Sequence, residues 1–69
     1  MIRTPVHSSN LASVGYDKKT MTLEIEFRDG SIYEYFDVPE TLHVGLMNAD
    51  SKGKFLHQHI KGSYRYAKV

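Results

Sequence analysis

The chain has 69 residues, no cysteine and a formal net charge of +1. This length predicts one domain over residues 1–69, near the small end of what folds unaided. The absence of cysteine excludes disulfides and thiolate zinc sites and fits a reducing, cytoplasmic location, and no stretch approaches the length of a membrane span.

The first twenty residues predict an arm, a strand and a turn. Residues 1–10 show no usable period, so we expect either a flexible arm or an extended lead-in that lies along the sheet. Residues 11–16 predict a short strand, because every second residue falls on one face. That face carries Ala12, Val14 and Tyr16. Polar residues 17–20 then predict a turn.

The strongest structural signal is a hairpin over residues 21–36, where two β-rich runs flank Asp29-Gly30. The first run alternates apolar and polar residues from Met21 to Phe27, which is typical of a half-buried strand and assigns Phe27 to the core. Together with the strand before it, this hairpin predicts a three-stranded antiparallel meander.

Two registers of this hairpin are open. A two-residue loop would put Ile32 and Phe36 inside, and also Glu34, while Tyr33 and Tyr35 would lie on the polar face. A three-residue loop with a glycine bulge would instead bury the two tyrosine rings and turn Glu34 toward solvent. Burying an unpaired carboxylate is costly, so we favour the second register, in which the tyrosine hydroxyls need partners.

Two short helices are expected after the sheet. Val38-Pro39 ends the strands, and Pro39 followed by Glu40 suits the first turn of a helix. Its apolar stripe predicts core packing. The stripe consists of Leu42, Leu46, Met47 and Ala49.

A second helix is expected from about Lys52, with Ser51 as its cap and Gly62 as its left-handed end. One face of this helix carries Phe55, Leu56, His59 and Ile60. Residues 64–69 alternate again and suggest a short final edge strand. The expected fold class is therefore α+β: a three-stranded antiparallel meander with two short C-terminal helices packed on one face, and a possible final strand.

Charge divides unevenly along the chain, at −4 over residues 1–50 and +5 over residues 51–69, which contain no acidic residue. Such asymmetry points to a segment that faces a polyanion. The candidate nucleic-acid contacts are Lys52, Lys54, Lys61, Tyr64, Arg65, Tyr66 and Lys68. The cations would contact phosphates, and the two tyrosines would stack on bases. The alternative is a solvated helix face that keeps the protein soluble.

Short motifs distributed along the chain resemble the KTSC domain, a small module found alone in bacterial and phage proteins and at the C-terminus of some lysyl-tRNA synthetases. The matching residues are Ser9, Gly15-Tyr16-Asp17, Leu23-x-Ile25-x-Phe27, Gly30, Tyr33-x-Tyr35, Val38-Pro39, Ser51-x-Gly53 and Ile60-Lys61. They span about residues 8–66. The resemblance implies the fold of the family and no established activity. RNA binding is suggested only by the tRNA synthetase setting.

Catalytic and metal chemistry find no support in the sequence. His57 and His59 diverge by about 200° on a helix and cannot share one ion, and His43 would have to complete any site. No nucleophile–base pair, P-loop or dinucleotide motif is present, so we expect no enzyme, no cofactor, no metal and no small-molecule substrate.

Two functions stay open. The first is a small non-enzymatic module that binds RNA through the basic C-terminal segment, with Tyr33 and Tyr35 as either a stacking platform or core rings. The second is a protein-interaction or structural module that pairs with itself or with a bacterial or phage partner through the outer face or edge of the sheet.

Overall fold

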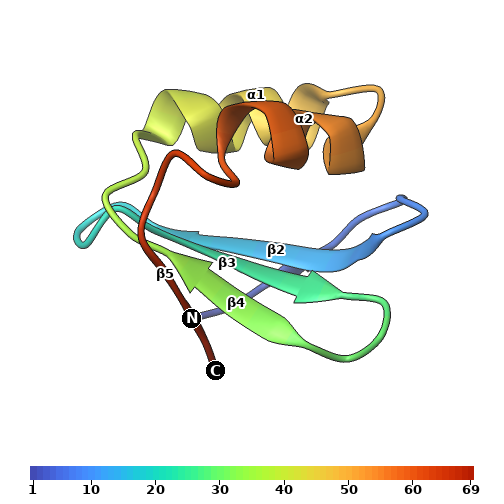
Figure 1. The fold of residues 1–69 in the computed structure, drawn as a ribbon, viewed down its shortest axis with the longest axis horizontal. Helices are drawn as coiled ribbons and strands as arrows, with labels where there is room; N and C mark the ends of the chain where they lie inside the picture. Colours follow the sequence, from blue (N-terminus) through green and yellow to red (C-terminus); the bar gives the residue numbers. More distant parts are fainter.

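A five-stranded antiparallel sheet with two helices across one face forms the protein in a computed structural model that describes residues 1–69 (Figure 1). The strands lie in chain order in the sheet. They are β1 (Thr4–Pro5), β2 (Leu11–Asp17), β3 (Thr22–Phe27), β4 (Ile32–Tyr35) and β5 (Tyr66–Lys68). Helices α1 (Glu40–Asn48) and α2 (Lys52–His59) connect β4 to β5. The α+β class is confirmed, but the three-stranded meander is only the centre of a larger sheet.

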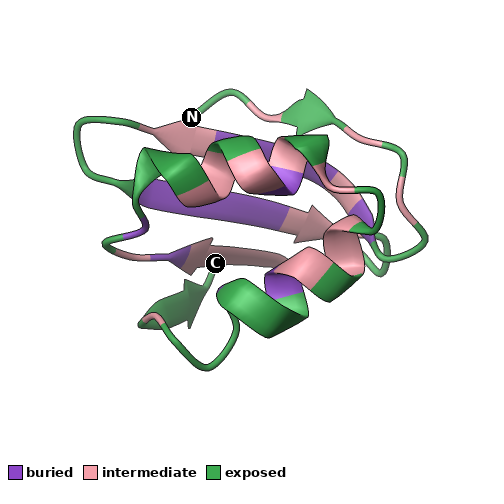
Figure 2. Cartoon of the chain, turned by 90° about the horizontal axis from the view of Figure 1, so that it is seen from above, coloured by how far each residue is buried: buried purple, intermediate pink, exposed green.

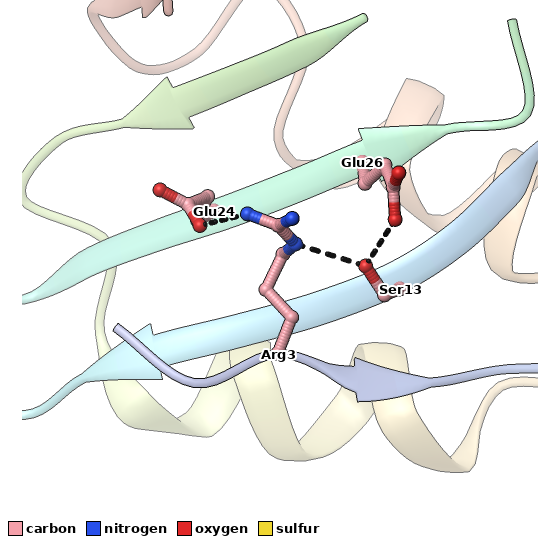
Figure 3. A network of polar contacts seen from close by, with 4 residues as sticks. All are labelled: Arg3, Ser13, Glu24 and Glu26. Carbon is pink, nitrogen blue, oxygen red and sulfur yellow. Dashed lines mark hydrogen bonds and ion pairs between the residues drawn. The ribbon is translucent and has the colours of Figure 1, made fainter. Parts of the chain in front are cut away.

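The N-terminal arm supplies the first additional strand. β1 pairs antiparallel with β2, so the extended lead-in is the correct alternative for residues 1–10. Arg3 holds the arm on the outer face of the sheet, because its guanidinium donates to the Ser13 hydroxyl at 3.0 Å and pairs with Glu24 at 2.5 Å (Figure 3). Ser13 in turn donates to Glu26 at 2.8 Å. The arm therefore partly neutralises an acidic outer face.

The face predicted for the first strand needs a correction. The register of β2 against β3 shifts between Leu11 and Ser13, an irregularity typical of a β-bulge. As a result both Leu11 and Val14 are buried in the core, although strict alternation would separate them. Ala12 is only half-buried, so Leu11 takes the core position that the sequence pattern gave to Ala12.

The β3–β4 hairpin adopts the three-residue loop. The Phe27 amide donates to the Ser31 carbonyl at 2.8 Å, and Ile25 lies opposite Tyr33. Gly30 has a φ of +92°, which a residue with a side chain rarely adopts, and this explains the glycine at the bulge. One boundary differs from the prediction, because Met21 has a φ of 55° and lies exposed before the strand begins.

The core lies between the sheet and the two helices. Figure 2 shows the buried residues concentrated along β2 and β3 beneath the helices, while β5 is exposed. The buried hydrophobic residues are Leu11, Val14, Leu23, Ile25, Tyr35, Val38, Leu46, Leu56 and Ile60. Phe27 is only partly buried and packs against this cluster, so it lies at the edge of the core to which the sequence pattern assigned it.

The ends of α2 follow the predicted chemistry, whereas at α1 Pro39 is the extended residue before the helix and not part of its first turn. The Ser51 hydroxyl accepts the Lys54 amide at the start of α2, and Gly62 has a φ of 82° after the helix. Leu56 and Ile60 of the predicted apolar face are buried, whereas His59 is exposed and its ring lies 4.6 Å from that of Phe55. Neither helix has the length and apolar character that crossing a bilayer requires.

Candidate nucleic-acid interface

An open hollow of about 700 Å³ lies between the β3–β4 hairpin, β5 and the turn that follows α2. Strand register explains how its floor forms. Tyr33 and Tyr35 lie opposite Ile25 and Leu23, which are core residues, so the two tyrosines are on the helix-covered face of the sheet. The next strand places Tyr66 opposite Tyr35 and Lys68 opposite Tyr33 on that same face.

Four aromatic rings form a continuous row in this hollow. Phe27 contacts Tyr33 edge-on, with centroids 5.7 Å apart, and Tyr33 lies 5.9 Å from Tyr66. Tyr66 is also 5.9 Å from Tyr35. The rings differ in exposure: Tyr35 is 3% exposed and Tyr66 is 62% exposed, while Phe27 and Tyr33 are half-buried. Tyr35 is therefore a core ring, whereas Tyr66 offers its surface to a ligand.

Charged groups surround the rings. The Lys61 ammonium lies 5.4 Å from the centroid of the Phe27 ring, and the guanidinium of Arg28 donates to the Ser8 carbonyl at 2.6 Å. Asp29 accepts bonds from the hydroxyl and the amide of Ser31, and these bonds lower the pKa of the Asp29 carboxyl. The hollow thus combines cations with one ionised carboxylate.

The most buried tyrosine of the hollow is un-ionised at neutral pH, as tyrosines ordinarily are. Desolvation raises the pKa of the Tyr35 hydroxyl, and the neighbouring Tyr33 and Tyr66 add smaller effects in the same direction. An un-ionised hydroxyl does not repel a bound anion. The floor of the hollow is therefore uncharged, and its charge comes from the rim.

The other predicted contact residues lie outside this hollow. Lys52 donates to the Ala49 carbonyl at 3.2 Å, and Lys54 is exposed in the first turn of α2. Arg65 pairs with Asp37 at 2.8 Å. Tyr64 is partly buried and packs against the core, which makes it a poorer stacking surface than Tyr66. The structure therefore brings Lys61 and Tyr66 together with Tyr33 and Tyr35. Lys68 lies opposite Tyr33 in β5 without lining the hollow. The other predicted contacts lie apart from it, and they are Lys52, Lys54, Tyr64 and Arg65.

Sequence reasoning missed several residues of the hollow. Phe27 was placed in the core, and neither Arg28 nor Asp29 was considered as part of a site, although all three line it. The favoured hairpin register did offer a signal for Arg28 and Asp29. It places the loop of residues 28–30 at the end of the hairpin, next to the face that carries Tyr33. Asn10 also lines the hollow, and only the folded chain brings it there.

Histidine and acidic side chains do not form a metal-binding cluster in this structure. No cluster of three or more His, Cys, Asp or Glu side chains lies close enough to hold a metal ion. His43 stacks on Tyr16 with centroids 4.8 Å apart, and burial lowers the pKa of this histidine. The Tyr16 hydroxyl donates to the Val38 carbonyl at 2.5 Å. These contacts fasten α1 to the end of the sheet.

Comparison with known proteins places the chain in context. Residues 7–64 match the family model of the KTSC domain. A lysine–tRNA ligase from Nostoc sp. is 50% identical over 54 residues, which cover 78% of this chain and 10% of the ligase. The chain thus spans about a tenth of the length of the ligases that it matches.

Two other similar proteins have nearly the same length as this chain. A protein from Stutzerimonas stutzeri is 40% identical over 70 residues, covering 100% of this chain and 99% of the relative. The crystal structure of a KTSC domain protein from Yersinia pestis matches with a TM-score of 0.95 and 45% identity. That match covers 99% of this chain and 96% of the solved one.

Proposed function

We propose that this chain, which belongs to the KTSC domain family, is a non-enzymatic module that binds RNA through the cations of residues 51–69. One observation carries the proposal. Of the five cations in this segment, only Arg65 forms an ion pair, which leaves four lysine ammonium groups without an acidic partner. Unpaired cations of this kind can neutralise phosphates and release counterions, the main source of affinity for nucleic acid.

The positions of the lysines support contact with the phosphate backbone of RNA. Lys54 is exposed in the first turn of α2, and Lys61 is exposed in the turn that follows the end of this helix, so the two ammonium groups lie at opposite ends of α2. Lys68 shares a face of the sheet with Tyr33. A single strand could therefore run along α2 and into the hollow.

The glutamates of the central strands lie on the opposite surface. Glu24 and Glu34 lie opposite each other on the outer face of the sheet, with Glu26 beside them. This arrangement leaves Asp29 as the one carboxylate that lines the hollow, so repulsion of a phosphate there is weaker than on the outer face. It favours approach of a polyanion from the side of the hollow.

The relatives support RNA as the nucleic acid. This chain is similar to a segment of lysine–tRNA ligases, enzymes whose name states that they act on tRNA. The segment covers about a tenth of those enzymes, so we propose an auxiliary binding role and carry no ligase activity over to this chain.

Salt-dependent titration of fluorescently labelled single-stranded RNA by the protein tests the proposal. Wild type should bind weakly at low salt and lose affinity steeply as salt rises, because the logarithm of the association constant falls with a slope of about 0.7 per phosphate contact on a single strand. Changing Lys54, Lys61 and Lys68 to Gln should weaken binding and flatten this slope. Lys19→Gln removes one exposed charge from the turn between β2 and β3 and should change little. A wild type that binds no RNA at low salt, or a triple variant that binds as wild type does, would contradict the proposal.

The edge of the sheet favours a second candidate function. β5 is a short outer strand, and all three of its residues are exposed, so it could pair with a strand of a second copy or of a protein partner. A dimer of this kind would persist at high salt because backbone hydrogen bonds hold it. Sedimentation of the protein at low and high salt separates this candidate from RNA binding.

A further inference from the structure

We infer that the hollow between the β3–β4 hairpin, β5 and the turn after α2 binds one unpaired base of RNA, stacked on Tyr66 with its phosphate beside Lys61. The inference rests on the proposed RNA binding and adds a defined pocket for a single nucleotide to it. A contact with phosphates alone depends only on charge, whereas this pocket also requires a base.

Tyr66 has the properties of a stacking platform. Its side chain is 62% exposed, yet it is supported from below by two rings, Tyr33 and Tyr35, each 5.9 Å away. β5 fixes its direction, because Tyr66 is paired opposite Tyr35 in the sheet. A ring held in this way loses little side-chain freedom when a base stacks on it, so more of the stacking energy appears as affinity.

The remaining lining matches the other parts of a nucleotide. Lys61 supplies a cation at the rim, 5.4 Å above the Phe27 ring, where a phosphate attached to a stacked base can reach it. Asp29 and Asn10 add an acceptor and an amide that can bond the edge of a base. The volume of about 700 Å³ falls within the range of pockets for small ligands.

Single-stranded RNA is the occupant that uses all of these groups. A base in a double helix is stacked on its neighbours and cannot offer its face to a side chain, so the pocket requires an unpaired nucleotide. A bare polyanion would use Lys61 but leave the tyrosine rings unused. An apolar peptide would cover the rings but leave the Lys61 ammonium without an anionic partner.

The test compares two ligands of equal charge and length. One is a single-stranded RNA pentanucleotide, and the other is the same ribose-phosphate backbone without bases. Wild type should bind the base-containing strand at least about fivefold more tightly, since stacking on an aromatic ring contributes on that scale. Tyr66→Leu should remove this preference, whereas the matched variant Tyr66→Phe keeps the ring and should retain it. Lys61→Gln should weaken both ligands by a similar factor.

The outcomes separate this inference from the proposed function. If wild type binds both ligands equally, or if a folded Tyr66→Leu variant keeps the full preference, the pocket does not hold a base, although salt-sensitive RNA binding stands. If wild type binds neither ligand at low salt, the proposed function fails and the pocket fails with it. The amide spectrum of Tyr66→Leu shows whether the variant is folded, which is expected because the side chain is mostly exposed.

Discussion

Truncation of Leu46 to alanine should remove most of the stability of this protein. Leu46 is fully buried and is the one fully buried residue of α1, so it anchors that helix to the sheet. Leucine-to-alanine changes at such sites cost about 2–5 kcal/mol, because the lost burial is accompanied by a cavity. A domain of this size without disulfides typically has only about 3–5 kcal/mol in total. A loss of about 3 kcal/mol would leave a substantial unfolded fraction at 25 °C.

Val44 on the same helix provides the matched control. Its side chain is 51% exposed, so Val44→Ala removes little burial and replaces a β-branched residue with the best helix former. The change in the free energy of unfolding should stay within about 0.5 kcal/mol. Urea denaturation followed by far-UV circular dichroism measures both variants, with sulfate added if Leu46→Ala does not fold in buffer. Equal effects of the two changes would refute the docking of α1 through Leu46.

Three further predictions follow from individual contacts. Ser51→Ala should destabilise the protein by about 1 kcal/mol, because the Lys54 amide loses its cap, whereas Ser51→Asp should retain stability in the same urea assay. Arg3→Gln should speed hydrogen exchange of the β1–β2 amides, since Glu24 loses its ion pair; unchanged exchange would show that the arm does not depend on it. A hydrogen bond with Glu24 raises the pKa of the Glu34 carboxyl above its ordinary 4.5, and burial and the negative charge of Glu24 act in the same direction. Protonated Glu34 therefore contributes stability that is fully present below that pH and is lost as the pH rises through the pKa of the folded state. Glu34→Gln should therefore raise the urea midpoint relative to wild type at pH 7 but not at pH 4, and a difference independent of pH would contradict this cause.

Local chemistry made the centre of the fold predictable. The hairpin register followed from the cost of burying Glu34, and the ends of α2 followed from a serine cap and a left-handed glycine at Gly62. These signals lie within a few residues of the structure that they determine. The bulge in β2 had no comparable signal in the sequence. Alternation alone therefore could not predict that Leu11, and not Ala12, faces the core.

The edge strands and the hollow depend on contacts between distant residues. β1 forms where Arg3 reaches Glu24, 21 positions away, and its two residues of pairing leave no clear pattern in the sequence, whereas the alternation over residues 64–69 did indicate β5. Lys61 lies over Phe27 only because α2 ends above the hairpin. The sequence therefore identified Lys61 and Tyr66 as candidates by charge and residue type but could not place them in one pocket.

The central claim is that RNA binds on the side of the hollow, and a backbone NMR titration with single-stranded RNA at two salt concentrations tests it most directly. We expect the largest shifts at the amides of Lys61, Tyr66 and Lys68, with smaller shifts at the higher salt concentration. The acidic outer face provides an internal reference, because the amides of Glu24 and Glu26 should not respond. Absence of shifts at low salt, or shifts concentrated on that outer face, would contradict the account.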